Sequence, residues 1–218
     1  TVFEPRALAD MIAPFIRQFS SRAIEDDQSF LRKLDGNTFV GTRMFRDTVT
    51  LRSDPLAAGI QVPPFTVEGL MLPPVTWVRD GIIERIATDR FTAAERNIAP
   101  LPLPANLLMD GGEKDIDAIV GETTRGLLLP GFADLRMIDP KNCLLSGSTR
   151  DGLFLIEEGK ITRAVRNLLI RETPVYLFKE LEEAGLVEIT STTGSHFPMR
   201  LPPLRVRDVL FGAATGLI

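Results

Sequence analysis

The sequence predicts an α+β fold whose core is a predominantly antiparallel β-sheet or a barrel-like sheet, with two main helices near residues 4–20 and 174–184. Three observations predict this fold: helical spacing of apolar residues in those two segments, short alternating strand patterns elsewhere, and 17 glycines and 16 prolines that punctuate the chain. With 218 residues, 44% of them hydrophobic, the chain can bury one substantial core. We therefore expect a single domain over residues 1–218.

The first helix is indicated by apolar residues spaced three and four apart, namely Leu8, Met11, Ile12, Phe15, Ile16 and Phe19. This stripe should pack on a sheet. Pro5 suits the first helical turn, whereas Pro14 is expected to kink or split the helix, because proline lacks a backbone donor and clashes one turn back. The second helix should begin at Pro174, with Gly185 as its stop.

Two segments of the remaining chain have the pattern of β-hairpins. Residues 75–83 and 154–161 each place alternating apolar residues around a turn that contains glycine, Gly81 in the first and Gly159 in the second. Glycine tolerates the positive φ that reverses a strand in a two-residue turn. We expect antiparallel pairing within each segment.

Composition limits the compartment and the partners. A single cysteine, Cys143, cannot form an intrachain disulfide, which favours a cytoplasmic protein. The longest apolar run, residues 98–109, is interrupted by three prolines and is too short to span a membrane, and no signal peptide is evident. The 25 basic and 29 acidic residues give a net charge of −4, which argues against nucleic acid as a partner.

Catalytic and metal-ligating residues are not predicted in this chain. His196 is the only histidine and Cys143 the only cysteine, so nitrogen and sulfur ligands cannot complete a zinc site. A serine or cysteine nucleophile would need His196 as its base, and neighbouring Ser195 would point to the opposite face of an extended segment. We expect no cofactor in this chain.

The densest polar segment is residues 146–152, where Gly147, Thr149, Arg150 and Asp151 lie between apolar strands. A structural role, in tight backbone geometry and local pairing, is favoured. The alternative is a peptide-binding site formed by the same four residues. If the segment is extended, Arg150 and Asp151 point to opposite sides, so we expect different partners for them, with one of the two partly buried.

Residues 139–167 resemble the C-terminal domain of the TldD/PmbA (TldE) family. The family characteristically has the run Thr-Gly-x-Thr-Arg-Asp-Gly-x-Phe-x-Ile-x-x-Gly-Lys-Ile. Residues 146–161 read Ser-Gly-Ser-Thr-Arg-Asp-Gly-Leu-Phe-Leu-Ile-Glu-Glu-Gly-Lys-Ile. Residues 64–69 and 89–94 agree with shorter family segments in the same order.

The resemblance implies peptide processing in the cytoplasm. Family members are subunits of a zinc metalloprotease and were formerly called modulators of DNA gyrase. The catalytic member has a His-Glu-x-x-x-His motif upstream of this domain and a cysteine ligand near its C-terminus. This sequence contains no such motif, and residues 189–198, where the cysteine should lie, contain none.

The resemblance therefore implies a C-terminal, non-catalytic domain that is inactive alone, with the N-terminal domain absent from this chain. Zinc is implied only for a catalytic partner or for an absent N-terminal region. The implied partners are a second TldD/PmbA-like subunit, in a homo- or heterodimer, and a peptide substrate. The alternative is a non-proteolytic protein-interaction domain of the gyrase-modulator kind, and the sequence upstream of Thr1 would discriminate between the two.

Overall fold

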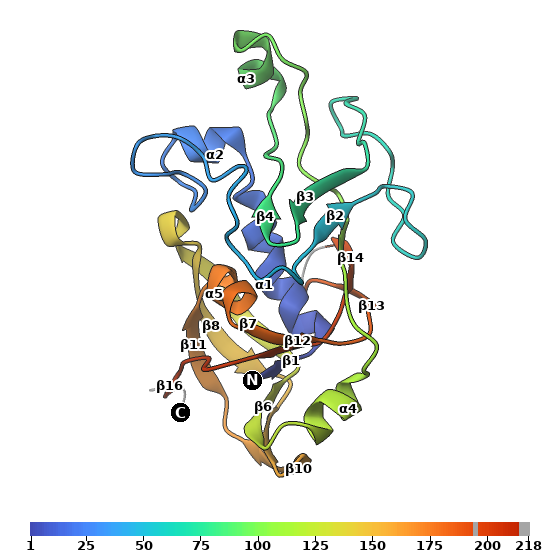
Figure 1. The fold of residues 1–218 in the computed structure, drawn as a ribbon, viewed down its shortest axis with the longest axis vertical. Coiled ribbons are helices and arrows are strands. Elements are labelled where there is room, and N and C mark those ends of the chain that lie inside the picture. Colours follow the sequence, from blue (N-terminus) through green and yellow to red (C-terminus); the bar gives the residue numbers. More distant parts are fainter. Residues whose placement is uncertain (194–195, 214–218) are drawn as a thin grey trace.

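The computed structural model describes residues 1–193 and 196–213, and it confirms a mixed α+β fold dominated by sheets (Figure 1). Three open sheets surround one long helix, α1. Within the described residues, the pairs β1–β6 and β5–β14 are parallel and all other strand pairs are antiparallel. The predominantly antiparallel prediction is therefore confirmed, in open sheets and not in a closed barrel.

The first sheet has six strands, in the order β10 (Lys160–Val165), β9 (Leu153–Glu157), β6 (Arg125–Leu129), β1 (Val2–Phe3), β15 (Leu204–Val206) and β12 (Leu181–Ala184). The second has four, β16 (Phe211–Ala213), β11 (Leu168–Glu172), β8 (Leu144–Arg150) and β7 (Gly131–Asp139). The third has six, β13 (Glu188–Ser191), β14 (Pro198–Leu201), β5 (Leu107–Met109), β2 (Leu51–Ser53), β3 (Val75–Arg79) and β4 (Ile82–Ile83).

Helix α1 (Pro5–Arg17) forms the centre of the core (Figure 1). Its apolar stripe is buried as predicted, and Phe15 lies at the middle of an aromatic cluster. The ring centroid of Phe15 is 5.2 to 5.9 Å from those of Phe19, Phe30, Phe45 and Phe178. Such contacts add to the stabilisation that burial alone provides.

Pro14 does not split α1, because the helix continues through it to Arg17. The proline removes one helical hydrogen bond, but the buried stripe on the other face holds both halves against the core. Its ring lies on the face of the helix that is only partly buried.

The second predicted helix is shorter than expected. Helix α5 covers Pro174–Lys179, and the chain then pairs as β12 with β15. Leu181 is buried there, and Glu183 Oε2 lies 3.1 Å from Arg205 Nη2 of β15. Tertiary pairing with a strand distant in sequence thus overrides the local helical pattern, and the prediction of a helix to residue 184 was wrong.

Three short helices were not predicted: α2 (Ser21–Glu25), α3 (Arg90–Glu95) and α4 (Ile116–Gly121). Each follows a capping residue whose side chain accepts a hydrogen bond from a backbone N–H of the first turn. The caps are Ser20, Asp89 and Asp115.

In the part of the chain that the structure describes, no helix is long and apolar enough to cross a membrane.

Both predicted hairpins are confirmed, as β3–β4 and β9–β10. Their turns are Asp80-Gly81 and Glu158-Gly159, and all four residues have positive φ. Two consecutive positive φ values define the mirror-image turn that matches strand twist. A Cβ on Gly81 would lie 2.3 Å from the carbonyl oxygen of Phe45, so close approach also requires glycine there.

Candidate functional site

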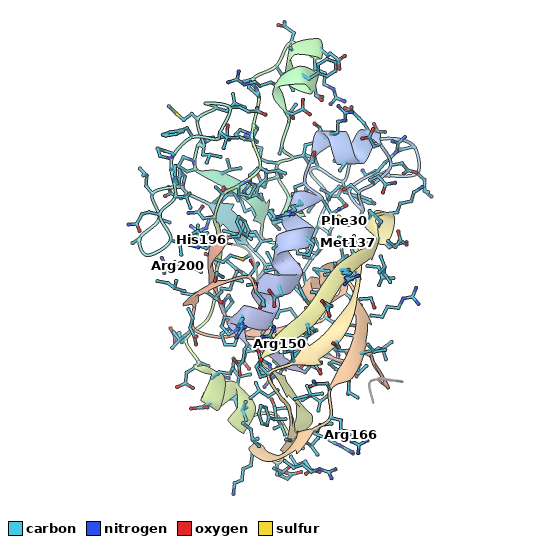
Figure 2. All side chains as sticks on the ribbon, turned by 180° about the vertical axis from the view of Figure 1, so that it is seen from behind. Phe30, Met137, Arg150, Arg166, His196 and Arg200 are labelled. Atoms are coloured by element: carbon cyan, nitrogen blue, oxygen red, sulfur yellow. The ribbon has the colours of Figure 1, made fainter. Side chains whose placement is uncertain are left out.

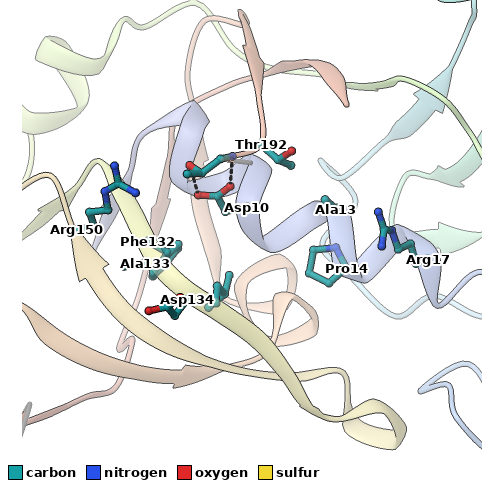
Figure 3. Close-up of a pocket in the computed structure, with 11 residues that line it drawn as sticks. Asp10, Ala13, Pro14, Arg17, Phe132, Ala133, Asp134, Arg150 and Thr192 are labelled. Carbon is teal, nitrogen blue, oxygen red and sulfur yellow. Dashed lines mark hydrogen bonds between the residues drawn. The ribbon is translucent and has the colours of Figure 1, made fainter. Parts of the chain in front are cut away.

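A cleft of about 520 Å³ opens between α1, β7 and the segment that follows β13 (Figure 3). It is lined by Asp10, Ala13, Pro14, Arg17, Phe132, Ala133, Asp134, Leu135, Arg150, Thr192 and Thr193. These residues come from parts of the chain that lie far apart in sequence. Only the fold brings them together, and the segment 146–152 contributes Arg150.

One wall of the cleft is the outward face of α1. Asp10, Ala13, Pro14 and Arg17 are spaced three, four and seven apart, which places them on one side of a helix. The buried stripe occupies the other side. Figure 3 shows Arg150 and Arg17 toward opposite ends of the cleft, with Asp10 and Pro14 between them.

The opposite wall is strand β7, which has a bulge at this point. Ala133 pairs with Ser148 and Arg136 pairs with Ser146, so two residues of β7, Asp134 and Leu135, lie opposite the single residue Gly147. Asp134 has φ +52°, a conformation that aspartate tolerates better than most residues. A bulge of this kind bends the strand and redirects side chains. Asp134 and Leu135 thereby reach the cleft.

A chain of polar contacts closes one end of the cleft. The Asp10 carboxylate accepts hydrogen bonds from the backbone N–H of Thr193 at 2.7 Å and from its hydroxyl at 3.0 Å (Figure 3). Arg6 Nε lies 3.4 Å from the same hydroxyl oxygen, and Arg6 Nη1 lies 3.4 Å from Asp151 Oδ2. Arg150 Nε donates to Asp151 Oδ1 at 3.1 Å. These contacts tie α1, the turn after β8 and the segment after β13 together.

The expectation of different partners for Arg150 and Asp151 was wrong, since the two side chains pair with each other. Their exposed fractions are 49% and 37%, so neither is part of a buried pair. The physical reason is the backbone: Asp151 has φ +63° and Gly152 has φ +98°. The chain turns at Asp151, and the alternation of an extended strand ends there.

Gly147 and Thr149 do not line the cleft but support the strands around it. A Cβ on Gly147 would lie 2.9 Å from Leu135 Cα, so the bulge in β7 requires glycine opposite it. Thr149 is buried, and its hydroxyl oxygen accepts a hydrogen bond from the backbone N–H of Leu168 at 2.9 Å. Of the four residues predicted for a peptide site, Arg150 lines the cleft, Asp151 lies at its rim, and the other two support the strands behind it.

Sequence patterns did not indicate Asp10, Arg17, Asp134 and Thr193 as cleft residues. One signal was present in α1, where two charged residues seven apart flank Pro14 on the face opposite the apolar stripe. No local signal marks Asp134 or Thr193. Ser195, the sequence neighbour of His196, lies outside the described residues.

The described residues do not fit a zinc ion. Among residues 1–193 and 196–213, no three histidine, cysteine, aspartate or glutamate side chains are grouped so that they could hold a metal. Cys143 is fully buried in the core, and burial raises the pKa of its thiol to about 12. His196 is exposed, whereas Cys143 lies in the core.

The fold is shared with solved structures. TldE from Thermococcus kodakarensis superposes with a TM-score of 0.80 at 17% identity, over 97% of this chain and 49% of that one. A putative modulator of DNA gyrase from Bacteroides thetaiotaomicron gives 0.81 at 22% identity, over 97% and 46%. A putative modulator of a DNA gyrase from Thermotoga maritima gives 0.79 at 19% identity, over 96% and 48%. This chain thus spans about half the length of these structures.

The amino-acid sequence has a family match but no significant match to a curated protein. The family described as the PmbA/TldA metallopeptidase C-terminal domain matches over residues 1–213, which is nearly the whole chain. The chain therefore belongs to the TldD/PmbA family, as one of its C-terminal domains.

Proposed function

We propose that this chain is the non-catalytic C-terminal domain of a subunit in a cytoplasmic, peptide-processing zinc metalloprotease, and that it binds peptide in the cleft between α1 and β7. The observation that supports this most is the composition of the cleft. Arg150 of the family motif and Thr193, from the segment in which the family's cysteine ligand was expected, line the same opening. The two parts of the sequence that the family resemblance singles out therefore meet at one site.

The walls of the cleft suit an extended peptide. Among the described residues, strand β7 ends the four-stranded sheet and pairs with β8 alone, so its other edge can add a further strand through main-chain hydrogen bonds. Residues 132–135 of β7 line the cleft directly. Main-chain recognition of this kind tolerates many peptide sequences.

Among the described residues, no three histidine, cysteine, aspartate or glutamate side chains are grouped to hold a metal, so in this proposal the zinc centre lies elsewhere. Zinc would come from a second TldD/PmbA-like subunit, in a homo- or heterodimer, or from a region N-terminal to this domain. The role of this domain would be to hold the peptide while that centre cleaves it.

The proposal is tested with a short, unstructured, fluorescein-labelled peptide. The purified chain should bind the peptide, as read by fluorescence anisotropy, and leave it intact. Adding a family subunit that carries His-Glu-x-x-x-His should give cleavage that depends on zinc. Failure of the chain to bind the peptide would contradict the proposal, as would cleavage by the chain alone.

A second candidate function, protein interaction without proteolysis, is favoured by a separate apolar pocket. This pocket has a volume of about 510 Å³, and its lining includes Leu56, Phe65 and Met71, which are 70%, 59% and 77% exposed. Exposed apolar groups around a pocket are typical of contact surfaces. If this function is the correct one, Phe65→Ser and Met71→Ser will abolish association with a family subunit and leave peptide binding unchanged.

A further inference from the structure

Among the described residues, four charged side chains line the cleft, and three of them have partners. Asp10 is hydrogen-bonded by Thr193, and Arg150 is paired with Asp151. Asp134 Oδ1 lies 3.9 Å from Arg136 Nη2. Arg17 is exposed, and its side chain makes no hydrogen bond or ion pair with residues 1–193 and 196–213. Its guanidinium is thus the charged group of the cleft that remains open to a ligand.

Pro14 removes one helical donor on the same wall. A proline has no backbone N–H, so the carbonyl of Asp10, four residues earlier, lacks its usual helical donor. Asp10 and Pro14 both line the cleft. The Asp10 carbonyl lacks its i+4 donor and belongs to a residue that lines the cleft.

The spacing of these two groups fits an extended chain. Arg17 follows Asp10 by seven positions, which corresponds to a rise of about 10 Å along the helix axis between their Cα atoms. An extended peptide covers that distance with about three residues. One ligand strand can then donate a main-chain N–H to the Asp10 carbonyl and place a side chain against Arg17.

We propose that the cleft selects peptides that carry a carboxylate, with Arg17 binding the carboxylate and the Asp10 carbonyl accepting a main-chain N–H. This inference rests on the proposed peptide-binding function and deepens it by naming the substrate class. A guanidinium presents two parallel donors that match the two carboxylate oxygens. The carboxylate comes either from an acidic side chain or from the C-terminus of the peptide.

Two labelled peptides test the side-chain source. They are unstructured octapeptides with amidated C-termini that differ only in one central residue, glutamate or glutamine. The full chain should bind the glutamate peptide more tightly. Arg17→Gln should weaken binding of the glutamate peptide about tenfold, since a charge-assisted hydrogen bond has roughly that effect, and should leave the glutamine peptide unaffected.

A third peptide tests the terminal source. It carries the central glutamine and a free C-terminal carboxylate. If its binding depends on Arg17 and that of the amidated glutamate peptide does not, the carboxylate is that of the C-terminus. Arg17→Lys should recover only part of the affinity, because an ammonium lacks the planar pair of donors.

A matched control separates recognition from general charge. Arg166 is also exposed and makes no ion pair with the described residues. It directly follows β10, near one end of the molecule (Figure 2). Arg166→Gln should bind all three peptides like the wild-type chain. The glutamine peptide is a second control. Arg17 lies in the last turn of α1, where its positive charge interacts favourably with the helix dipole, so its loss could also weaken the helix. Such a structural effect would weaken the binding of every peptide equally.

Pro14→Ala tests the carbonyl. Alanine restores the N–H, so the Asp10 carbonyl regains its helical donor. We expect a higher melting temperature together with weaker binding of all three peptides. A substitution that only strengthened the helix would raise stability without lowering affinity.

The outcomes distinguish this inference from the proposed function. If the three peptides bind with equal affinity and Arg17→Gln changes none of them, carboxylate selection is overturned while peptide binding stands. If Pro14→Ala binds as tightly as the wild type, the role of the Asp10 carbonyl is overturned. If no peptide binds the full chain, the proposed function fails and this inference fails with it.

Discussion

Asp151 Oδ2 lies 3.4 Å from Arg6 Nη1, and this contact joins the turn after β8 to the first turn of α1. The other oxygen of the same carboxylate accepts from Arg150. Asp151 is therefore held between two guanidinium groups at the rim of the cleft. The family motif is in this way linked to the helix that forms the opposite wall.

We predict that Asp151→Asn lowers the free energy of unfolding by less than about 1 kcal/mol, because partly exposed ion pairs contribute little. Asparagine also tolerates the positive φ of this position. Asp151→Ala should cost about 1 kcal/mol more, since alanine is strained there. Urea denaturation of the three proteins measures both effects. Equal losses for the two variants would show that the backbone conformation contributes nothing.

Gly147→Ala should lower the free energy of unfolding by about 1 to 3 kcal/mol, because the new Cβ would meet backbone atoms of the β7 bulge. Gly121→Ala is the matched control. It lies at the end of α4 and its Cβ would meet nothing within 4 Å, so stability should rise by up to about 1 kcal/mol. Thermal unfolding of both variants is the measurement, and a neutral Gly147→Ala would show that the bulge adjusts freely.

The elements that local patterns define were predicted from the sequence. The apolar stripe of α1 and the glycine turns at Gly81 and Gly159 depend on neighbouring residues only, and the structure confirms them. The end of the second helix was not predictable in this way. Leu181 and Glu183 continue a helical pattern, but β15 provides a pairing edge and the cation of Arg205.

The cleft was predictable only in part. The polar motif identified Arg150, which lines the cleft. The contact of Asp10 with Thr193 joins positions 183 residues apart, and no local pattern indicates such a pairing. The positive φ of Asp151 did have a local signal, because Asp151-Gly152 is an Asp-Gly pair and such pairs are typical of turns, and the expectation of an extended conformation overlooked it.

Cys143 should resist thiol reagents in the folded protein. It is fully buried, and burial raises the pKa of its thiol to about 12, so at about pH 8 almost no thiolate is present to react. We expect iodoacetamide to modify it only after denaturant unfolds the chain, as measured by intact mass. Modification under native conditions at the rate of free cysteine would contradict this placement.

Glu172 should make stability depend on pH. Burial raises the pKa of its carboxyl above the ordinary value, so the folded state favours the protonated form. The stability that Glu172 contributes is fully present below the unfolded pKa of about 4.3 and is lost as pH rises through the higher folded pKa. Glu172→Gln keeps an oxygen that can accept from the N–H of Thr173 and removes the buried charge.

We therefore expect Glu172→Gln to be more stable than the wild type near pH 7 and to lose that advantage as pH falls toward about 4. Urea denaturation across this range gives the difference at each pH, which cancels contributions from other groups such as Glu4, whose pKa burial also raises. Glu113→Gln, on an exposed loop, is the control and should differ little from wild type throughout. A Glu172→Gln variant that is less stable at pH 7 would show that the Glu172 carboxylate is stabilised by its surroundings, and so would contradict the direction assigned to its pKa.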